Sequence, residues 1–442
     1  MFLFQFRFRG ILCVSGRNRK RKVQLATYLM RSNGNFEGVR NLKPFSFVHA
    51  ADLHLGYSQY GLEIRREDFD RAFSELVDRT IELTPDLMII AGDVFHQARP
   101  SNATLENSIK NFNRLREAGI SVLTVDGSHD SAPNSITGTI MNPLDSAGLI
   151  YHLPRHEGAC WRKADCCYVY GVPNYRNRHR TEEMLPVFME ENRPTPDPSL
   201  FNVFVFHMAL DLPSVNPSYI EAEAPPELIP EGFDYYAAGH VHSPHVEKFK
   251  TGLLVYSGST ETTDYSEARI RKGFYHVKVD ETRVASLDFV EFESSREFVI
   301  LEQDFTSLVP SKITEQSVQT VKASDKEGAV IIPIIKGVLP IGATRTEVDV
   351  ARIRAAAEKA LLVHPVISLR ESEVSEEVVR SIFESDIKDL RTKAFEYFLQ
   401  IFSERHSREE AERIAHIAAS LIEPLTEKQE EKVKQAIEEL LQ

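Results

Sequence analysis

The sequence predicts an α/β fold that is followed by a small α+β unit and a helical tail. Between residues 45 and 259, short apolar runs alternate with segments of helical periodicity, a pattern typical of strand–helix–strand units in a largely parallel sheet. A β-α-β-α-β pattern then spans residues 295–373, and from about residue 375 the chain is helical and charged. A chain of 442 residues is also too long for one core, so we expect two or three domains.

Seven apolar runs predict the buried strands of the first domain. They are residues 45–50, 86–92, 121–126, 168–173, 201–207, 234–240 and 253–259. Residues 66–83 and 104–119 have the period of amphipathic helices, and Gly119 stands where a glycine commonly ends a helix. The Pro-rich residues 192–199 predict a surface loop.

The small α+β unit and the tail are predicted from shorter patterns. Residues 297–305, 329–337 and 365–372 are expected strands, and 313–324 and 350–363 are expected helices. In the tail, Phe395, Phe398, Ile401 and Phe402 have the spacing of one helix face, and residues 427–442 predict a strongly charged last helix. Such a stripe either docks on its own domain or binds a partner's helix, and the sequence favours neither.

Composition narrows the class of protein. With 42% hydrophobic and 26% charged residues the chain is expected to be globular, and no apolar run is long enough to cross a bilayer. Four cysteines without C-x-x-C spacing favour a reducing compartment and give no zinc or disulfide framework. The net charge of −13 argues mildly against non-specific duplex binding, although residues 1–45 hold ten Lys and Arg against one Glu. We interpret residues 1–44 as a disordered basic extension; a nucleic-acid-binding arm is the alternative.

Metal-binding side chains occur where five of the predicted strands end. Asp52 and His54 follow the first strand, Asp93 follows the second, and Gly127, Ser128 and His129 follow the third. His207 ends the strand at 201–207, His240 ends the strand at 234–240, and His242 follows it. The carboxyl ends of parallel strands share one edge of a sheet, where α/β proteins build their sites. In extended backbone, residues two apart face the same way, so each of the pairs 52/54 and 240/242 can reach one ion.

The types of donor indicate the ion and the reaction. Imidazole and carboxylate groups without thiolates suit manganese, iron or zinc better than calcium or magnesium. The donors suffice for two ions that share one carboxylate, and two ions about 3.5–4 Å apart favour phosphoester hydrolysis. The remaining histidines lack this context and are expected in packing, surface or loop roles: His49, His152, His156, His179, His245, His364 and His416.

The order D-x-H, G-D, G-x-H-D, H and G-H-x-H resembles the calcineurin-like metallophosphoesterases. The flanking stretches "DLHLGY", "RREDFDRAF", "AGDVFHQARPS" and "VYSGSTETTDYSE" are similar, more closely, to the DNA double-strand-break repair nuclease of the MRE/SbcD family. The resemblance covers about residues 45–290 and extends to a small cap at 295–373. It implies an α/β sandwich of two sheets flanked by helices, a small α+β capping domain and a helical C-terminal tail.

The resemblance also implies the roles of individual residues. One manganese ion would be held by Asp52, His54, Asp93 and His242. A second would be held by Asp93, Ser128, His207 and His240. His129 would stabilise the scissile phosphate and protonate the leaving oxygen, and His96 would help to orient the DNA phosphate.

The family's activity and partners follow from the same resemblance. It implies a manganese-dependent nuclease subunit of a DNA repair complex, with 3′→5′ exonuclease activity on duplex ends and endonuclease activity on single strands. It implies a homodimer that forms a heterotetramer with an SbcC-type coiled-coil ABC ATPase, without a membrane. The expected divisions are the extension 1–44, a nuclease domain 45–293, a DNA-binding cap 294–373 and an ATPase-binding region 374–442. The expected location is cytoplasmic, on the nucleoid if the cell lacks a nucleus.

Ser128 departs from the family, which has Asn at this position. A Ser hydroxyl is shorter than an amide and a weaker donor, so we expect a weakened second ion and an intact first one. Nothing suggests that the nearby Asn134 replaces it. Two alternatives therefore stay open: a scaffold that binds DNA ends with an impaired second ion, and a binuclear phosphoesterase that acts on nucleotides or phosphoproteins.

Overall fold

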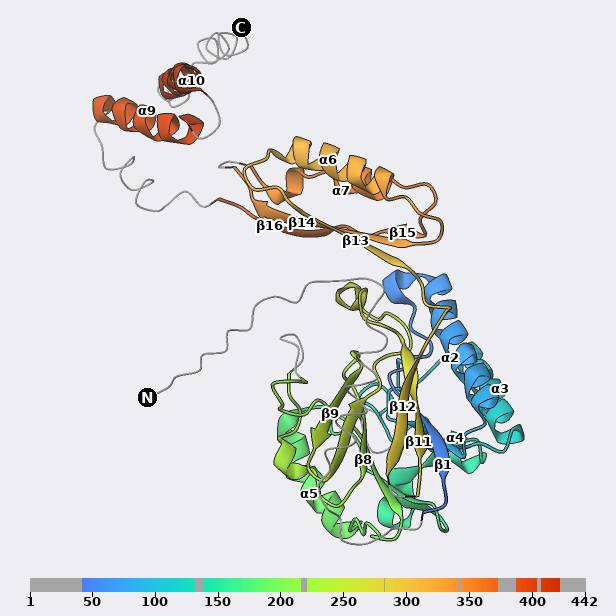
Figure 1. Cartoon of the computed structure of the whole chain (residues 1–442). Coiled ribbons are helices and arrows are strands. Elements are labelled where there is room, and N and C mark those ends of the chain that lie inside the picture. Colours follow the sequence, from blue (N-terminus) through green and yellow to red (C-terminus); the bar gives the residue numbers. More distant parts are fainter. Residues whose placement is uncertain are drawn as a thin grey trace, which may run out of the picture. The chain divides into compact units, whose positions relative to one another are not determined.

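The computed structural model describes residues 42–131, 138–215, 221–281, 283–340, 343–372, 387–403 and 407–421. The chain divides into two compact units (Figure 1). One comprises Met1–Ile300, Lys326–Ile332 and Lys359–Leu362, and the other comprises Leu301–Asp325, Pro333–Glu358 and Val363–Gln442. The domain limits at residues 44, 293 and 373 stay predictions.

Two six-stranded sheets form the centre of the first unit. The first sheet contains β1 (Phe45–Ala50), β2 (Leu87–Ile90), β3 (Ser121–Thr124), β4 (Tyr151–His152), β11 (Gly273–Val279) and β12 (Val284–Glu291), in the order β12-β11-β1-β2-β3-β4. Strands β1 to β4 run parallel, and β11 and β12 join antiparallel. The second contains β5 (Cys160–Lys163), β6 (Cys167–Gly171), β7 (Phe201–His207), β8 (Tyr235–Gly239), β9 (His245–Phe249) and β10 (Gly252–Tyr256), in the order β5-β6-β7-β8-β10-β9.

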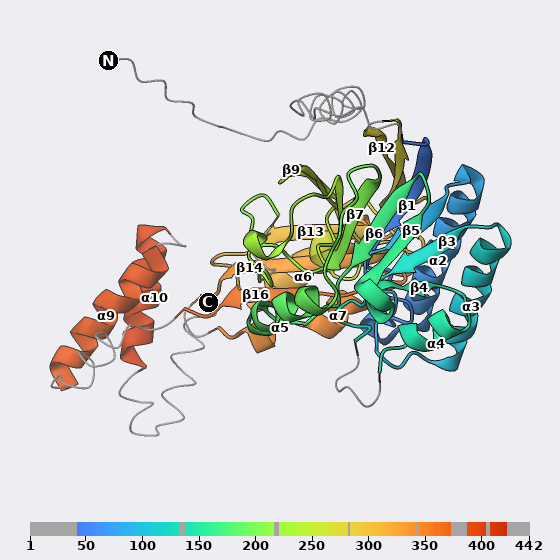
Figure 2. The ribbon, with the colours of Figure 1, turned by 90° about the horizontal axis from the view of Figure 1, so that it is seen from below.

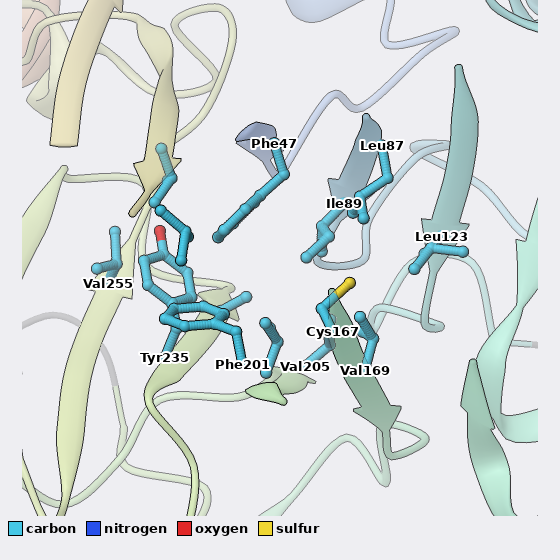
Figure 3. Close-up of a cluster of buried hydrophobic side chains, with 14 of the residues drawn as sticks. Phe47, Leu87, Ile89, Leu123, Cys167, Val169, Phe201, Val205, Tyr235 and Val255 are labelled. Carbon is cyan, nitrogen blue, oxygen red and sulfur yellow. The ribbon is translucent and has the colours of Figure 1, made fainter. Parts of the chain in front are cut away.

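The sheets face each other across a buried core, as the predicted sandwich requires. Phe47 and Ile89 of the first sheet pack in one cluster with Val205 and Tyr235 of the second (Figure 3). The rings of Phe47 and Tyr235 meet edge to face with centroids 5.2 Å apart. The inner strands of both sheets, such as β2, β7 and β8, are buried along their whole length, which explains why they appear in the sequence as continuous apolar runs.

Helices cover the outer face of each sheet (Figure 2). Helices α2 (Glu63–Leu83), α3 (Asn102–Glu117) and α4 (Met141–Ser146) pack on the first sheet, and α5 (Arg178–Glu191) packs on the second. The Ser101 side chain caps α3 by accepting from the Thr104 amide at 3.2 Å, and Gly119 follows its end with φ +77°. Single 3₁₀ turns are η1 (Gln59–Gly61), η2 (Leu153–Arg155), η3 (Glu157–Ala159), η4 (Pro226–Leu228), η5 (Tyr265–Glu267) and η6 (Arg345–Glu347).

The rest of the described chain forms a small α+β region and two helices. Strands β13 (Phe298–Asp304), β14 (Val330–Val338), β15 (Leu362–Val363) and β16 (Val366–Arg370) form one sheet, with α6 (Pro310–Ala323) and α7 (Val350–Arg354) between them. Helices α9 (Ile387–Ser403) and α10 (Arg408–Ser420) contact each other, and the rings of Phe395 and His416 lie 4.2 Å apart. No helix within these described ranges is long and apolar enough to cross a membrane.

Two local predictions were wrong. Residues 350–363 were expected to form one helix, but α7 ends at Arg354 because the following backbone is bonded elsewhere: Glu358 donates to the Asp325 side chain at 2.9 Å and Leu361 donates to Ala329 at 2.9 Å. His245 was expected in a loop, but it begins β9 opposite Tyr256. The extension up to residue 41, Asn134 and the last predicted helix lie outside the described residues.

Candidate metal centre

The predicted ligand residues converge where strands of both sheets end. Asp52 and His54 follow β1, Asp93 follows β2 and Ser128 follows the β3 end, all in the first sheet; His207 ends β7, and His240 and His242 follow β8, in the second. The sequence pointed to one sheet edge, whereas the structure forms the site from the adjoining edges of two sheets. In the described chain, His, Asp and Glu donors gather in three groups: Asp52, His54 and His242; Asp52, Asp93 and His207; and His54, His96 and His129.

The two aspartates lie at the centre of this cluster. Asp93 Oδ2 lies 3.2 Å from His207 Nε2 and 4.0 Å from His54 Nε2. Asp52 Oδ1 lies 3.7 Å from His242 Nε2 and 3.8 Å from His207 Nε2. The Nε2 atoms of His54 and His242 are 3.2 Å apart. Asp93 therefore faces imidazoles from both sheets, and Asp52 faces two imidazoles from the second sheet, as residues that share or flank bound cations do.

Strained backbone holds these side chains in place. Asp52, His54, Asp93 and His240 have φ values of 54°, 47°, 50° and 86°, in the left-handed region that non-glycine residues rarely adopt. Each such residue costs about 1–3 kcal/mol and persists only where its surroundings enforce it. Four of the seven predicted ligand positions are strained in this way, which is typical of a functional site.

Outer partners orient two of the imidazoles. His207 Nδ1 donates to the Ala91 carbonyl at 2.7 Å, so its buried Nε2 faces the aspartates and lies 3.2 Å from Asp93 Oδ2. His242 Nδ1 lies 2.6 Å from Glu267, whose other oxygen accepts from Lys272 at 2.7 Å. Ligand histidines usually have such a second partner. Neither Glu267 nor Lys272 was expected from the sequence: Glu267 ends the family-like stretch "DYSE", and Lys272 lies outside it.

The turn after β3 packs directly on Asp93. The Ser128 hydroxyl donates to Asp93 Oδ2 at 3.3 Å, and the His129 amide donates to Asp93 Oδ1 at 2.8 Å. Asp130 accepts from the amides of Val94, Phe95 and Gly127 at 2.8–3.1 Å, which joins the two loops. The structure thus brings Ser128 into the centre, where its hydroxyl reaches the carboxylate that both ions would share.

The predicted catalytic histidine stands at the outer side of the centre. His129 is exposed, its Nδ1 donates to the His96 carbonyl at 2.9 Å, and its ring stacks on that of His96 with centroids 4.9 Å apart. The Tyr57 ring also stacks on that of His96, at 3.9 Å. Burial lowers the pKa of His96 to about 4, so this ring is neutral at physiological pH. The stack holds the His129 ring with Nδ1 bonded to the His96 carbonyl, so that Nε2 is the nitrogen that can contact a substrate.

Burial and charge set the protonation of the cluster. Although burial opposes it, the neighbouring His207 holds the pKa of Asp93 well below its usual range. The same contact outweighs burial and raises the pKa of His207 to about 10. Burial lowers the pKa of His240 to about 3 and that of His54 well below its usual value. His54 and His240 are therefore neutral, which is the form of an imidazole that binds a metal ion.

The residues fit divalent metal ions. The donors are imidazoles and carboxylates, the set that suits manganese, iron and zinc, and no cysteine of the described chain belongs to the cluster. Within the described residues the buried Nε2 of His207 makes no hydrogen bond of good geometry, although Asp93 Oδ2 lies 3.2 Å away, an arrangement expected of two ligands of one cation. The centre therefore supports the use of a divalent metal.

Comparisons with known proteins identify the family of the chain. Residues 45–244 match the family model of the calcineurin-like phosphoesterases. The chain is 30% identical over 337 residues to the DNA double-strand break repair protein Mre11 of Methanopyrus kandleri, covering 73% of this chain and 70% of that protein. It is also 30% identical over 342 residues to the Mre11 protein of Archaeoglobus fulgidus, covering 71% of each. Among solved structures, TT1561 of Thermus thermophilus matches 56% of this chain and 99% of its own at 12% identity, with a TM-score of 0.34. The resemblance inferred from the motifs is confirmed, and the chain belongs to the Mre11 family of calcineurin-like phosphoesterases.

Proposed function

We propose that this protein is the nuclease subunit of a DNA double-strand-break repair complex. It would hydrolyse phosphodiesters with two manganese ions, as a 3′→5′ exonuclease on duplex ends and an endonuclease on single strands. The two archaeal relatives named above, each 30% identical over most of the chain, support the DNA substrate. The observation that carries the proposal is Asp93, whose carboxylate lies within 4.0 Å of donors from His54, Ser128 and His207.

The proposed ligands divide into two sets that share Asp93. The first set is Asp52, His54, Asp93 and His242. The second set is Asp93, Ser128, His207 and His240. Divalent ions bound by such sets acidify water and neutralise the charge of a phosphodiester. The strained backbone and the outer partners described above keep the donors aimed at one place, so little reorganisation is needed on binding.

The remaining chemistry would fall to residues at the outer side of the centre. We assign to His129 the protonation of the leaving oxygen, because it is exposed and its Nδ1 is already engaged with the His96 carbonyl. That bond leaves Nε2 to hold the proton that the leaving group takes. We assign to His96 the orientation of the DNA phosphate, since its neutral ring stacks with both Tyr57 and His129.

The partners belong to the same proposal. The region 294–373 would contact DNA, and the region 374–442 would bind a coiled-coil ABC ATPase of the SbcC type, in a heterotetramer of two subunits each. In support of the second assignment, α9 and α10 carry apolar side chains with helical spacing, among them Phe398 and Phe402, whose rings stack 6.2 Å apart. The protein would act in the cytoplasm, at the chromosome.

Cleavage of a 3′-labelled duplex with added Mn²⁺ tests the proposal. We expect the unmodified protein to cut, His129→Ala to lose about 10²–10⁴-fold in rate, and Ser128→Asn to cut at lower Mn²⁺ concentration. His156→Ala is the control, because this imidazole pairs with Asp145 and takes no part in the cluster. An inert unmodified protein beside an active Ser128→Asn variant would instead favour the scaffold. Hydrolysis of nucleotides without any cleavage of DNA would favour the other phosphoesterase function.

A further inference from the structure

Each histidine that the second sheet contributes to the centre has an acceptor near one ring nitrogen. For His207 this is the Ala91 carbonyl, 2.7 Å from Nδ1, and for His242 it is Glu267, 2.6 Å from Nδ1. For His240 it is Glu223, whose Oε2 lies 3.6 Å from Nε2. His240 thus has its carboxylate on the opposite ring nitrogen, which leaves Nδ1 as its donor to an ion.

Glu223 is held in this position by its own backbone. Its amide donates to the Ala209 carbonyl at 2.8 Å, the Ala209 amide donates to its carboxylate at 3.4 Å, and Leu210 and Ala224 form an isolated bridge beside it. Ala209 lies two residues after His207, so the segment that carries Glu223 is anchored to the end of β7. The Glu223 side chain is only 8% exposed, and its ion-pair partner within the described residues is His240, an unusual environment for a glutamate.

We propose that Glu223 is a positioning residue for the second ion: its carboxylate, 3.6 Å from Nε2, favours the tautomer of His240 that is protonated there, which leaves Nδ1 to bind the ion together with Asp93 and Ser128. The inference rests on the ligand assignment of the proposed function and deepens it. A carboxylate partner fixes the tautomer of a ligand imidazole and raises its basicity. In this chain the second ion would have a hydroxyl donor in place of an amide. A more basic His240 imidazole would compensate for the weaker binding by the Ser128 hydroxyl.

If Glu223 had only a structural role, removing its charge would have a different result. Burying a carboxylate is unfavourable unless it is paired, so a neutral isostere at position 223 should not destabilise the metal-free fold. A structural Glu223 would instead make the metal-free variant less stable and weaken both ions together. The two roles are therefore separated by thermal unfolding in EDTA alongside metal binding.

Binding of Mn²⁺ to the full chain, followed by the EPR signal of free Mn²⁺, tests the inference without any activity assay. The unmodified protein is expected to bind two ions. Glu223→Gln should bind the second about 10–100-fold more weakly, with the first unchanged and with no lower unfolding temperature in EDTA. Glu267→Gln is the matched control, because it removes the carboxylate partner of His242 and should weaken the other ion. Equal binding of both ions by Glu223→Gln and the unmodified protein would overturn the inference.

A double variant gives the sharper result. Adding Ser128→Asn to Glu223→Gln should recover affinity for the second ion, whereas adding it to Glu267→Gln should not recover the first. Absence of that recovery would also overturn the inference, because the two residues would then not act on one ion. If the unmodified protein binds fewer than two ions, the ligand assignment itself fails. If it binds two and Glu223→Gln changes neither, only the role of Glu223 fails.

Discussion

Gly127 packs so closely on Asp93 that adding one methyl group at residue 127 tests the metal centre. A Cβ built on Gly127 would lie 2.0 Å from Asp93 Oδ1 and 2.2 Å from the Asp93 amide nitrogen. Real Cβ atoms essentially never approach closer than 3.0 Å, so Gly127→Ala must displace Asp93, or the turn, by about 1 Å. One of the two atoms is backbone, and it belongs to a residue that is already in a strained conformation, so a change of rotamer cannot relieve the clash.

The expected loss follows from that displacement. A shift of about 1 Å in reacting groups costs roughly 100-fold in rate, and overpacking costs about 1–3 kcal/mol of stability. Because Asp93 is the proposed shared ligand, Gly127→Ala should weaken both ions and reduce single-turnover cleavage of a labelled duplex about 100-fold at saturating Mn²⁺.

Gly148→Ala is the matched control. Gly148 has φ +66° with nothing within 4 Å of its added Cβ, so alanine there brings about 1–2 kcal/mol of backbone strain without touching the centre. Unfolding of both variants can be followed through Trp161, the only tryptophan, which packs against the core between the sheets. Cleavage by Gly127→Ala within about threefold of the unmodified rate would refute the reasoning, since Asp93 would then tolerate the shift.

Two further predictions concern stability, both measured as unfolding by urea in EDTA with Trp161 fluorescence. Asp68 is fully buried and lies 2.5 Å from the buried Arg65 and 2.6 Å from the half-buried Arg296, so Asp68→Asn leaves both cations short of a partner and should cost about 3–5 kcal/mol. Arg71→Gln, which removes an exposed partner of Asp68, should cost less than about 1 kcal/mol. Equal losses in the two variants would contradict this. Burial lowers the pKa of His49 to about 3, so only the unfolded chain takes up this proton below about pH 6.5. The free energy of unfolding then decreases as the pH falls from about 6.5 towards 3, by up to about 1.4 kcal/mol per pH unit. His49→Asn should remove this pH dependence. If the slope of stability against pH is the same in His49→Asn, His49 is not its source.

Local patterns in the sequence determined most elements and nearly all of the candidate ligands. The strands at 45–50 and 201–207 match β1 and β7 residue for residue, because strands buried on both faces are continuous apolar runs. Asp52, His54, Asp93 and the 127–130 turn could be found because each follows its strand directly in the chain. Residues that directly follow a strand can be recognised in the sequence, because their position depends only on the neighbouring residues.

Only the tertiary structure decided how these pieces meet. The sequence could not show that the strand ends come from two sheets, because strand pairing has no local signal. Strands β1 and β11, for example, pair although they lie more than 200 residues apart. The outer partners Glu223 and Glu267 were missed for the same reason, since what makes a carboxylate a partner of His240 or His242 is its proximity after folding. The helix expected at 350–363 failed because hydrogen bonds to residues 325–329 compete with those within the helix. Periodicity and strand-end chemistry are encoded locally, whereas sheet pairing and the second partner of each imidazole depend on long-range contacts.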